Sequence, residues 1–431
     1  MRRDDDDPLR LLVLGDFSGR PASERVPLAS RPTQQVDVDT LDAVILRTKP
    51  RLTGPGGEIA FDRLDDFHPD RLYGSLASFE ALRKARSKKP DRAETDALLG
   101  RLLGGASPGR DPVSPAAPVT GLDALIRNIV APHVVPDTSA TTAAYVAAVD
   151  AAIADQMRAV LHDPAFQALE ARWRGVQWLV SSLELDENLQ LHLFDVSREE
   201  LLADLAAGGT VTETGLYRAL VDRWRNVPGA PGWSVLTALF EFAPSDDDAA
   251  LLEPLGAIAS KAGAPLLAGF RVAPGGEGSA SAGWQALRRS PIAKWIGLAA
   301  PRVLLRRPYG QRSDPIDAFA FEELPGTPEH EHFLWGTGSL AASLLIGRSF
   351  TERGWSLEPG DEREIGDTPA FTFERDGETQ LQAGAERYLT ESDIRALLTA
   401  GVIPIASRRD TNGIAVIRFQ SMADPPGAVA W

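Results

Sequence analysis

The sequence contains no cysteine among its 431 residues, and only six histidines. The absence of cysteine excludes disulfides, thiolate catalysis and cysteine-ligated metal sites, and it fits a reducing compartment. His330 and His332 are close in sequence but lack the His-x-x-x-His spacing that places two imidazoles on one helix face. We therefore expect no metal site, and we interpret His162 as a helix-end residue favoured by the helix dipole.

Long apolar runs and excess positive charge are also lacking. No run approaches the roughly 20 apolar residues that a membrane span needs. The start, Met1-Arg2-Arg3 followed by four aspartates, has no apolar core of the kind found in secretory signals. Sixty acidic against forty-five basic residues give a net charge of -15, which repels phosphate backbones and anionic lipids. We expect a cytoplasmic protein without nucleic-acid partners.

The first part of the chain, residues 1–103, has the pattern of a small α/β unit and is called the N-terminal segment below. Leu9–Leu14 is an apolar run that ends at Gly15, typical of a buried strand entering a turn. A helix is predicted from Asp70 towards Lys88, with apolar residues at helical spacing. Residues 104–119 are rich in Gly, Ala, Ser and Pro, and this composition predicts a flexible linker.

Residues 120–425, called the C-terminal segment below, alternate between strand-like and helix-like patterns. This alternation predicts a layered α/β domain, followed by a short tail over 426–431. The predicted elements are helices at 141–161, from 164 onwards, 197–206, 247–261 and 329–350, and strands at 191–196, 235–242, 265–270, near 403 and at 414–419.

Two motifs of the N-terminal segment resemble the small subunit (TssB) of the type VI secretion sheath. They are LLVLGDFSGR at residues 11–20 and LDDFHPD at residues 64–70. The C-terminal segment resembles the large sheath subunit (TssC) through a longer ordered series of motifs. That series includes HDPAFQALE at 162–170, PRVLLR at 301–306, PYG at 308–310, LWG at 334–336, GVIP at 401–404 and FQS at 419–421.

The resemblance implies a fusion of two sheath subunits that the family makes as separate chains. It also implies two departures, because both subunits continue further in the family than the corresponding segments do here. The region beyond residues 419–421 belongs, in the family, to the apparatus by which sheath subunits exchange strands. Of the family's properties, polymerisation is the one that the resemblance predicts least well for this sequence.

The sequence gives little support to a catalytic function. Gly15–Gly19 resembles the nucleophile loop of some serine esterases. However, no Asp-x-x-His pair follows downstream that could activate Ser18. A turn in which Ser18 or Asp16 bonds its own backbone is the alternative. Gly275–Gly283 lacks the Gly-Lys-Ser/Thr ending of a phosphate-binding loop. We expect no enzyme activity and no cofactor.

Arg302 and Arg306 lie in an apolar segment, where arginine is costly to bury without a partner. We predict carboxylate partners for them, with Glu322 and Glu323 as candidates, in contacts either within the chain or between subunits. Trp173 is assigned to the core or to a domain interface.

An apolar helical stripe follows the linker. The family resemblance implies that a helix here is the handle grasped by an AAA+ ATPase that recycles contracted sheath. An ordinary packing helix is the more common use of such a stripe. Its residues are Leu122, Leu125, Ile126, Ile129 and Val130.

Two functional hypotheses remain open. The first is a sheath-type structural protomer with sheath subunits, inner tube, baseplate and the recycling ATPase as partners. The second is a truncated sheath relative that caps, nucleates or regulates sheath assembly.

Overall fold

A computed structural model describes residues 7–54, 57–87, 142–207, 209–225, 232–272, 280–408 and 411–431. The predicted linker at 104–119 and the apolar stripe at 122–130 lie outside these ranges.

A nine-stranded sheet runs through the molecule, in the order β11-β15-β14-β8-β7-β6-β1-β5-β2. The run from β5 to β14 through β1, β6, β7 and β8 is parallel, whereas β2, β15 and β11 are antiparallel to their neighbours. The strands are β1 (Leu9–Gly15), β2 (Gln34–Val36), β5 (Leu189–Asp195), β6 (Val235–Phe242), β7 (Leu266–Phe270), β8 (Ile296–Ala300), β11 (Glu364–Ile365), β14 (Val402–Ser407) and β15 (Ile414–Val416).

Strand β1 belongs to the N-terminal segment, yet it lies between two strands of the C-terminal segment. Leu11 is paired with Leu191 of β5 on one side and with Val235 of β6 on the other. All seven residues of β1 are buried, as a strand with neighbours on both sides and helices on both faces requires. The two segments therefore share one sheet.

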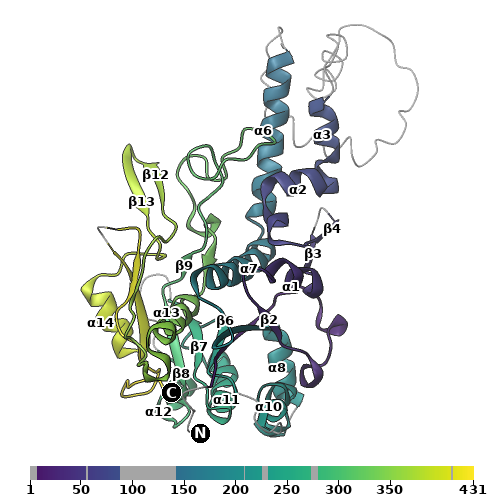
Figure 1. Cartoon of the computed structure of the whole chain (residues 1–431). Helices are drawn as coiled ribbons and strands as arrows, with labels where there is room; N and C mark the ends of the chain where they lie inside the picture. Colours follow the sequence, from purple (N-terminus) through teal and green to yellow (C-terminus); the bar gives the residue numbers. More distant parts are fainter. Residues whose placement is uncertain are drawn as a thin grey trace.

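Helices cover both faces of this sheet, as the alternating strand and helix patterns predicted. Side chains of β1 at positions 9, 11 and 13 enter one core with helices α7 (Pro164–Ser182) and α13 (Gly338–Arg353). Those at 12 and 14 enter a second core with α8 (Arg198–Ala207) and α11 (Asp246–Ala262). Figure 1 shows α7 and α11 on opposite sides of the sheet. The predicted α/β class is confirmed.

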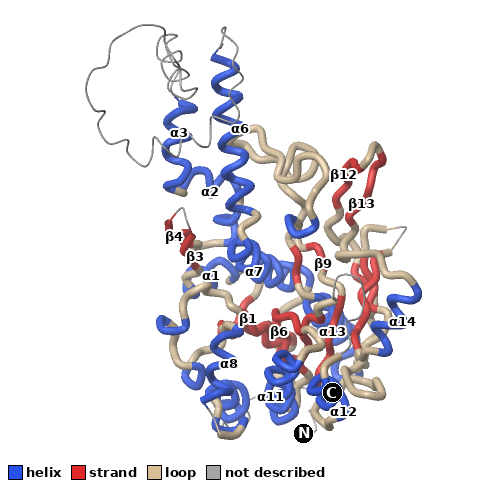
Figure 2. Tube along the Cα trace, turned by 180° about the vertical axis from the view of Figure 1, so that it is seen from behind, coloured by secondary structure: helices blue, strands red, loops and turns tan. Residues whose placement is uncertain are grey.

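Two helices leave the body of the molecule side by side. Both views show α3 (Glu80–Ser87) next to α6 (Thr142–Leu161), extending away from the sheet (Figures 1 and 2). An ion pair of 2.6 Å between Arg86 Nε and Asp150 Oδ1 joins them. This arm again combines the N-terminal segment with the C-terminal segment.

Short elements complete the described chain. The additional helices are α1 (Leu41–Thr48), α2 (Pro69–Ser75), α9 (Gly215–Tyr217), α10 (Arg223–Arg225), α12 (Ala282–Arg289) and α14 (Glu391–Thr399). The additional strands form the pairs β3 (Arg51–Gly54) with β4 (Gly57–Ala60), β9 (Val303–Leu304) with β10 (Trp335–Gly336), and β12 (Phe371–Arg375) with β13 (Glu378–Gln382).

Two predicted helices differ from the observed ones. The helix expected from Asp70 towards Lys88 is broken at Leu76, whose backbone is extended, so that α2 and α3 are separate. The helix expected at 329–350 begins only at Gly338, because Trp335 and Gly336 form a strand with β9. In both places tertiary packing overrides the local apolar spacing.

Candidate functional site

The carboxyl end of β1 is tied to the carboxyl end of β5 by a side chain. Gly15, the last residue of β1, lies opposite Asp195, the last residue of β5. The Asp195 carboxylate accepts hydrogen bonds from the backbone amides of Phe17 and Ser18 at 2.8 and 3.0 Å. These bonds satisfy two amides that have left the sheet, and they join the N-terminal segment to the C-terminal segment.

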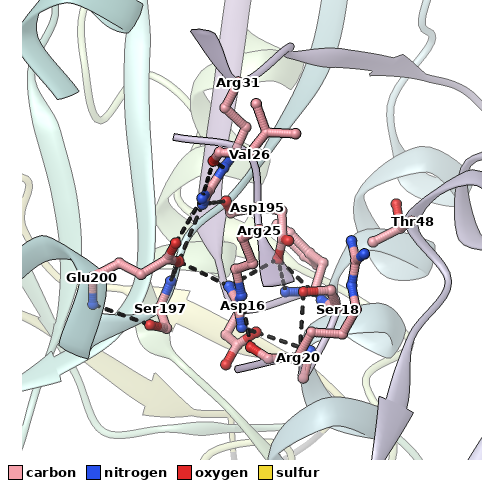
Figure 3. A network of polar contacts seen from close by, with 12 residues as sticks. Asp16, Ser18, Arg20, Arg25, Val26, Arg31, Thr48, Asp195, Ser197 and Glu200 are labelled. Carbon is pink, nitrogen blue, oxygen red and sulfur yellow. Dashed lines mark hydrogen bonds and ion pairs between the residues drawn. The ribbon is translucent and has the colours of Figure 1, made fainter. Parts of the chain in front are cut away.

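Beside this contact lies a group of ion pairs that we call the junction network: Asp16, Arg25, Arg31, Asp195 and Glu200. Arg25 donates to Asp16 Oδ1 at 2.5 Å and to Glu200 Oε2 at 3.0 Å. Arg31 donates to Glu200 Oε1 at 2.6 Å (Figure 3). Both arginines come from the N-terminal segment, and they converge on one carboxylate at the start of α8.

The two arginines and Glu200 of the junction network are shielded from water, so their charges depend on one another for compensation. The Arg25 side chain is only 2% exposed. Burial alone lowers the pKa of Arg25, but the charges of Asp195, Asp16 and Glu200 outweigh it and raise that pKa overall. Burial likewise raises the pKa of Glu200, yet the bonds from Arg31 and Ser197 and the charge of Arg25 leave it lowered. Arg25 and Glu200 therefore stay ionised at neutral pH.

An aromatic contact closes the junction from the other face of the sheet. Trp173 on α7 is fully buried, and its indole Nε1 donates to the Phe17 carbonyl at 3.0 Å. The two rings lie 5.2 Å apart. Trp173 thus serves the core and the contact between the segments at once, through a donor that would otherwise be buried without a partner.

The predicted ion-pair residues lie near one another, but their pairing differs in detail from the expectation. Arg306 is bound on one side by Glu323, with Nη1 2.7 Å from Oε2, and on the other by Glu170, with Nε 2.8 Å from Oε1. Both carboxylates are almost completely buried. Burial alone lowers the Arg306 pKa, but these two charges raise it well above its usual value. Both contacts are within the chain.

Arg302 pairs with Glu386 instead of Glu322 or Glu323. Its Nη2 lies 2.7 Å from Glu386 Oε1, because a backbone hydrogen bond from the Glu386 amide to the Arg302 carbonyl holds the two residues together. Glu322 Oε1 instead accepts the backbone amide of Gln311 at 3.1 Å. The local sequence gives no sign of Glu386, since 84 positions separate it from Arg302.

His162 follows the end of α6 but carries no charge there at neutral pH. Its ring stacks on His332, with centroids 3.9 Å apart. Burial, together with the charges of His332, Arg306 and Arg158, lowers the His162 pKa to about 4. The expected charge–dipole interaction is therefore wrong, because the site is too dry to hold an imidazolium.

The turn after β1 has the form of a backbone-bonded turn. Asp16 Oδ1 accepts the Gly19 amide at 3.0 Å, and Gly19 has φ +61°, a conformation that favours glycine. Ser18 is fully buried, where a substrate has no access to its hydroxyl. Within the described ranges no three His, Asp or Glu side chains gather in an arrangement that could hold a metal ion.

The proposed ATPase-contact stripe, Leu122 to Val130, lies outside the described residues and stays a prediction. The junction network was missed from the sequence. Arg25 and Glu200 are 175 positions apart, and no local pattern links them. The only available signal was the polar residue Asp195 at the end of an apolar strand.

Known proteins match the two segments separately. Residues 143–273 and 272–423 match the family VipB, described as "EvpB/VC_A0108, tail sheath N-terminal domain". Residues 3–91 match the family described as "Type VI secretion system, VipA, VC_A0107 or Hcp2".

Two curated relatives from Pseudomonas aeruginosa agree with this division. The type VI secretion system sheath protein TssC1 is 29% identical over 305 residues, which cover 65% of this chain and 61% of TssC1. The sheath protein TssB1 is 33% identical over 92 residues, covering 19% of this chain and 54% of TssB1. The chain thus spans about three fifths of one relative and half of the other. With the VipB match extending over more than half of its length, the chain belongs to the VipB tail sheath family and carries a VipA-like segment before it.

Proposed function

We propose that this chain is a structural, sheath-type protomer of a type VI secretion system or a related contractile injection apparatus. The observation that carries the proposal is β1: a strand of the VipA-like segment is paired on both sides with strands of the VipB-like segment. The covalent connection fixes in one chain a pairing of two sheath-type segments. The proposed role is non-enzymatic and is carried out in the cytoplasm.

The fusion favours this pairing through effective concentration. A short flexible connection holds two binding partners at roughly millimolar concentration of each other. We propose the division 1–103, 104–119, 120–425 and 426–431 as two sheath-type segments, a linker and a tail. The junction network and Trp173 then act as the permanent contact between the segments.

Assembly is tested with the purified full-length protein. Negative-stain electron microscopy and sedimentation velocity are carried out on the protein alone and after mixing with sheath and tube proteins of a contractile system. A sheath protomer forms tubular or ring-shaped assemblies or is incorporated along authentic sheath. A chain that remains a strict monomer, inert towards both proteins, contradicts the proposal.

We further propose other copies of this chain or sheath paralogues as partners, together with the inner tube, the baseplate and a recycling AAA+ ATPase. Pull-down with each component distinguishes these roles. A protomer binds sheath along its length at high stoichiometry, whereas a cap, nucleator or regulator binds sheath ends at low stoichiometry. For the ATPase, Leu125→Asp in the stripe removes binding, whereas Lys84→Ala leaves it unchanged.

A further inference from the structure

A cavity of about 510 Å³ opens at the carboxyl ends of the parallel strands. Its lining includes Asp16 after β1, Ser197 after β5, Glu241 in β6 and Arg271 after β7. Because β5 and β6 lie on opposite sides of β1, the strand order reverses at this place. Parallel α/β sheets form ligand-binding crevices at such reversal points, and the volume is that of a small-ligand pocket.

Arg172 on α7 lines this cavity and is not paired. In the described part of the chain, no hydrogen bond or ion pair to its guanidinium is present. Burial lowers its pKa; the carboxylates of Asp16 and Asp195 oppose this effect, and the charge of Arg25 adds to it. Arg172 is half-buried, and a guanidinium that lines a cavity without a protein partner keeps its N–H donors available to an added anion.

Two other arginines of the lining already have carboxylate partners. Arg198 is bonded to the Asp248 carboxylate. Arg302 donates to Glu386 at 2.7 Å. The nearby carboxylates cannot serve Arg172 fully, because Arg25 already takes up Asp16 at 2.5 Å. The side chains of Arg172 and Arg271 make no hydrogen bond or ion pair with described residues, and Arg172 is the less exposed of the two. Arg172 is therefore the group that gains more from an incoming anion.

The acidic residues of the lining limit which anion fits. Glu199, Glu241 and Glu331 also face the cavity. Burial raises the pKa of Glu241, with Arg302 and Arg271 opposing the rise and Glu386 and Glu331 adding to it. Three carboxylates repel a doubly charged phosphate more strongly than a singly charged group. A planar carboxylate also matches the two parallel N–H donors of a guanidinium.

We propose that this cavity binds a carboxylate group on Arg172, supplied by a small organic acid or by an acidic side chain of a second copy of this chain. The proposal rests on the cavity and not on the sheath role, so it stands or fails separately from the proposed function.

The first test is binding of small anions to the full-length protein. Calorimetric titration with acetate and glutamate, at constant ionic strength and with phosphate and chloride as comparison anions, measures affinity. We expect carboxylates to bind wild type at least tenfold more tightly than phosphate. Arg172→Met loses this binding, whereas the matched control Arg289→Met, on the exposed side of α12, retains it.

The second test distinguishes the source of the carboxylate. Sedimentation velocity over a concentration series reports self-association. Association that is abolished by Arg172→Met and competed by acetate assigns the carboxylate to a second copy. Carboxylate binding without such association assigns it to a small ligand.

The melting temperature of each variant without ligand shows whether the variant is folded. An unpaired Arg172 predicts that Arg172→Met melts at or above the wild-type temperature, and that Arg172→Lys behaves as wild type without ligand. The proposal is overturned if Arg172→Met melts well below wild type, or if neither carboxylate binding nor self-association depends on Arg172.

Discussion

At the scale of single residues, the contact between the two segments depends on a few buried ions. Arg25 touches three carboxylates, one from its own segment and two from the other. Removing one member of a buried ion group leaves the others uncompensated, at a cost of about 3–5 kcal/mol. Surface pairs such as Lys84 with Glu80 contribute far less, because water screens their charges.

We therefore expect Arg25→Ala to lower the free energy of unfolding by about 3–5 kcal/mol. Urea unfolding followed by circular dichroism measures the change. Lys84→Ala is the control and changes the free energy by less than about 0.5 kcal/mol. Equal effects of the two substitutions would show that the junction network does not hold the segments together.

Two buried histidines predict acid sensitivity. Burial, with the charge of Arg10 in addition, lowers the His192 pKa to about 3, and His162 lies at about 4. Histidine in the unfolded chain has a pKa of about 6.5. Below that pH the unfolded chain binds protons that the folded chain does not, so the free energy of unfolding decreases as the pH is lowered. Each histidine accounts for about 2 kcal/mol between pH 7 and pH 5.

The measurement is urea unfolding at pH 7, 6 and 5. His192→Gln is expected to reduce the loss of stability over this interval by about 2 kcal/mol, whatever its effect at pH 7. A pH dependence identical to that of wild type would mean that His192 is charged in the folded protein.

Whether an ion pair could be predicted from the sequence depends on how far apart its two residues are in the chain. The pairing of Arg306 with Glu323 spans only 17 positions, and the cost of burying arginine pointed to a carboxylate partner. Arg25 with Glu200 and Arg302 with Glu386 could not be found in this way. Their proximity arises from the order of strands in the sheet, which no local pattern records.

At the scale of elements, β1 is the strand that joins the two segments. Its burial followed from the apolar run and the break at Gly15, so its existence was predictable. Its position between β5 and β6 was not, because apolar content alone does not specify a strand's neighbours. The same limit explains why the helix expected at 329–350 begins only at Gly338, since the pairing of Trp335 and Gly336 with β9 is not local.

Native-state hydrogen exchange tests the position of β1. Amides of Leu11–Leu14 are expected to exchange as slowly as those of Leu236–Ala238 in β6, since both strands lie inside the sheet. The β12–β13 pair, a two-stranded sheet with largely exposed residues, is the control and exchanges faster. Exchange of β1 at the rate of β12 would contradict its placement.

At the scale of the whole molecule, sequence motifs were more informative than periodicity. They identified both sheath-type segments and their order, and the family matches agree with them. That the segments build one sheet and one projecting pair of helices became visible only in the structure. The two segments therefore form a single folded core.

The central claim is that the two segments form one inseparable unit, and cleavage of the folded chain tests it most directly. A protease site is introduced within residues 104–119, the folded protein is cut, and the products are separated by gel filtration under native conditions. The account predicts that the two fragments elute together at a 1:1 ratio with an unchanged circular dichroism spectrum. Elution as two independent folded species would contradict it.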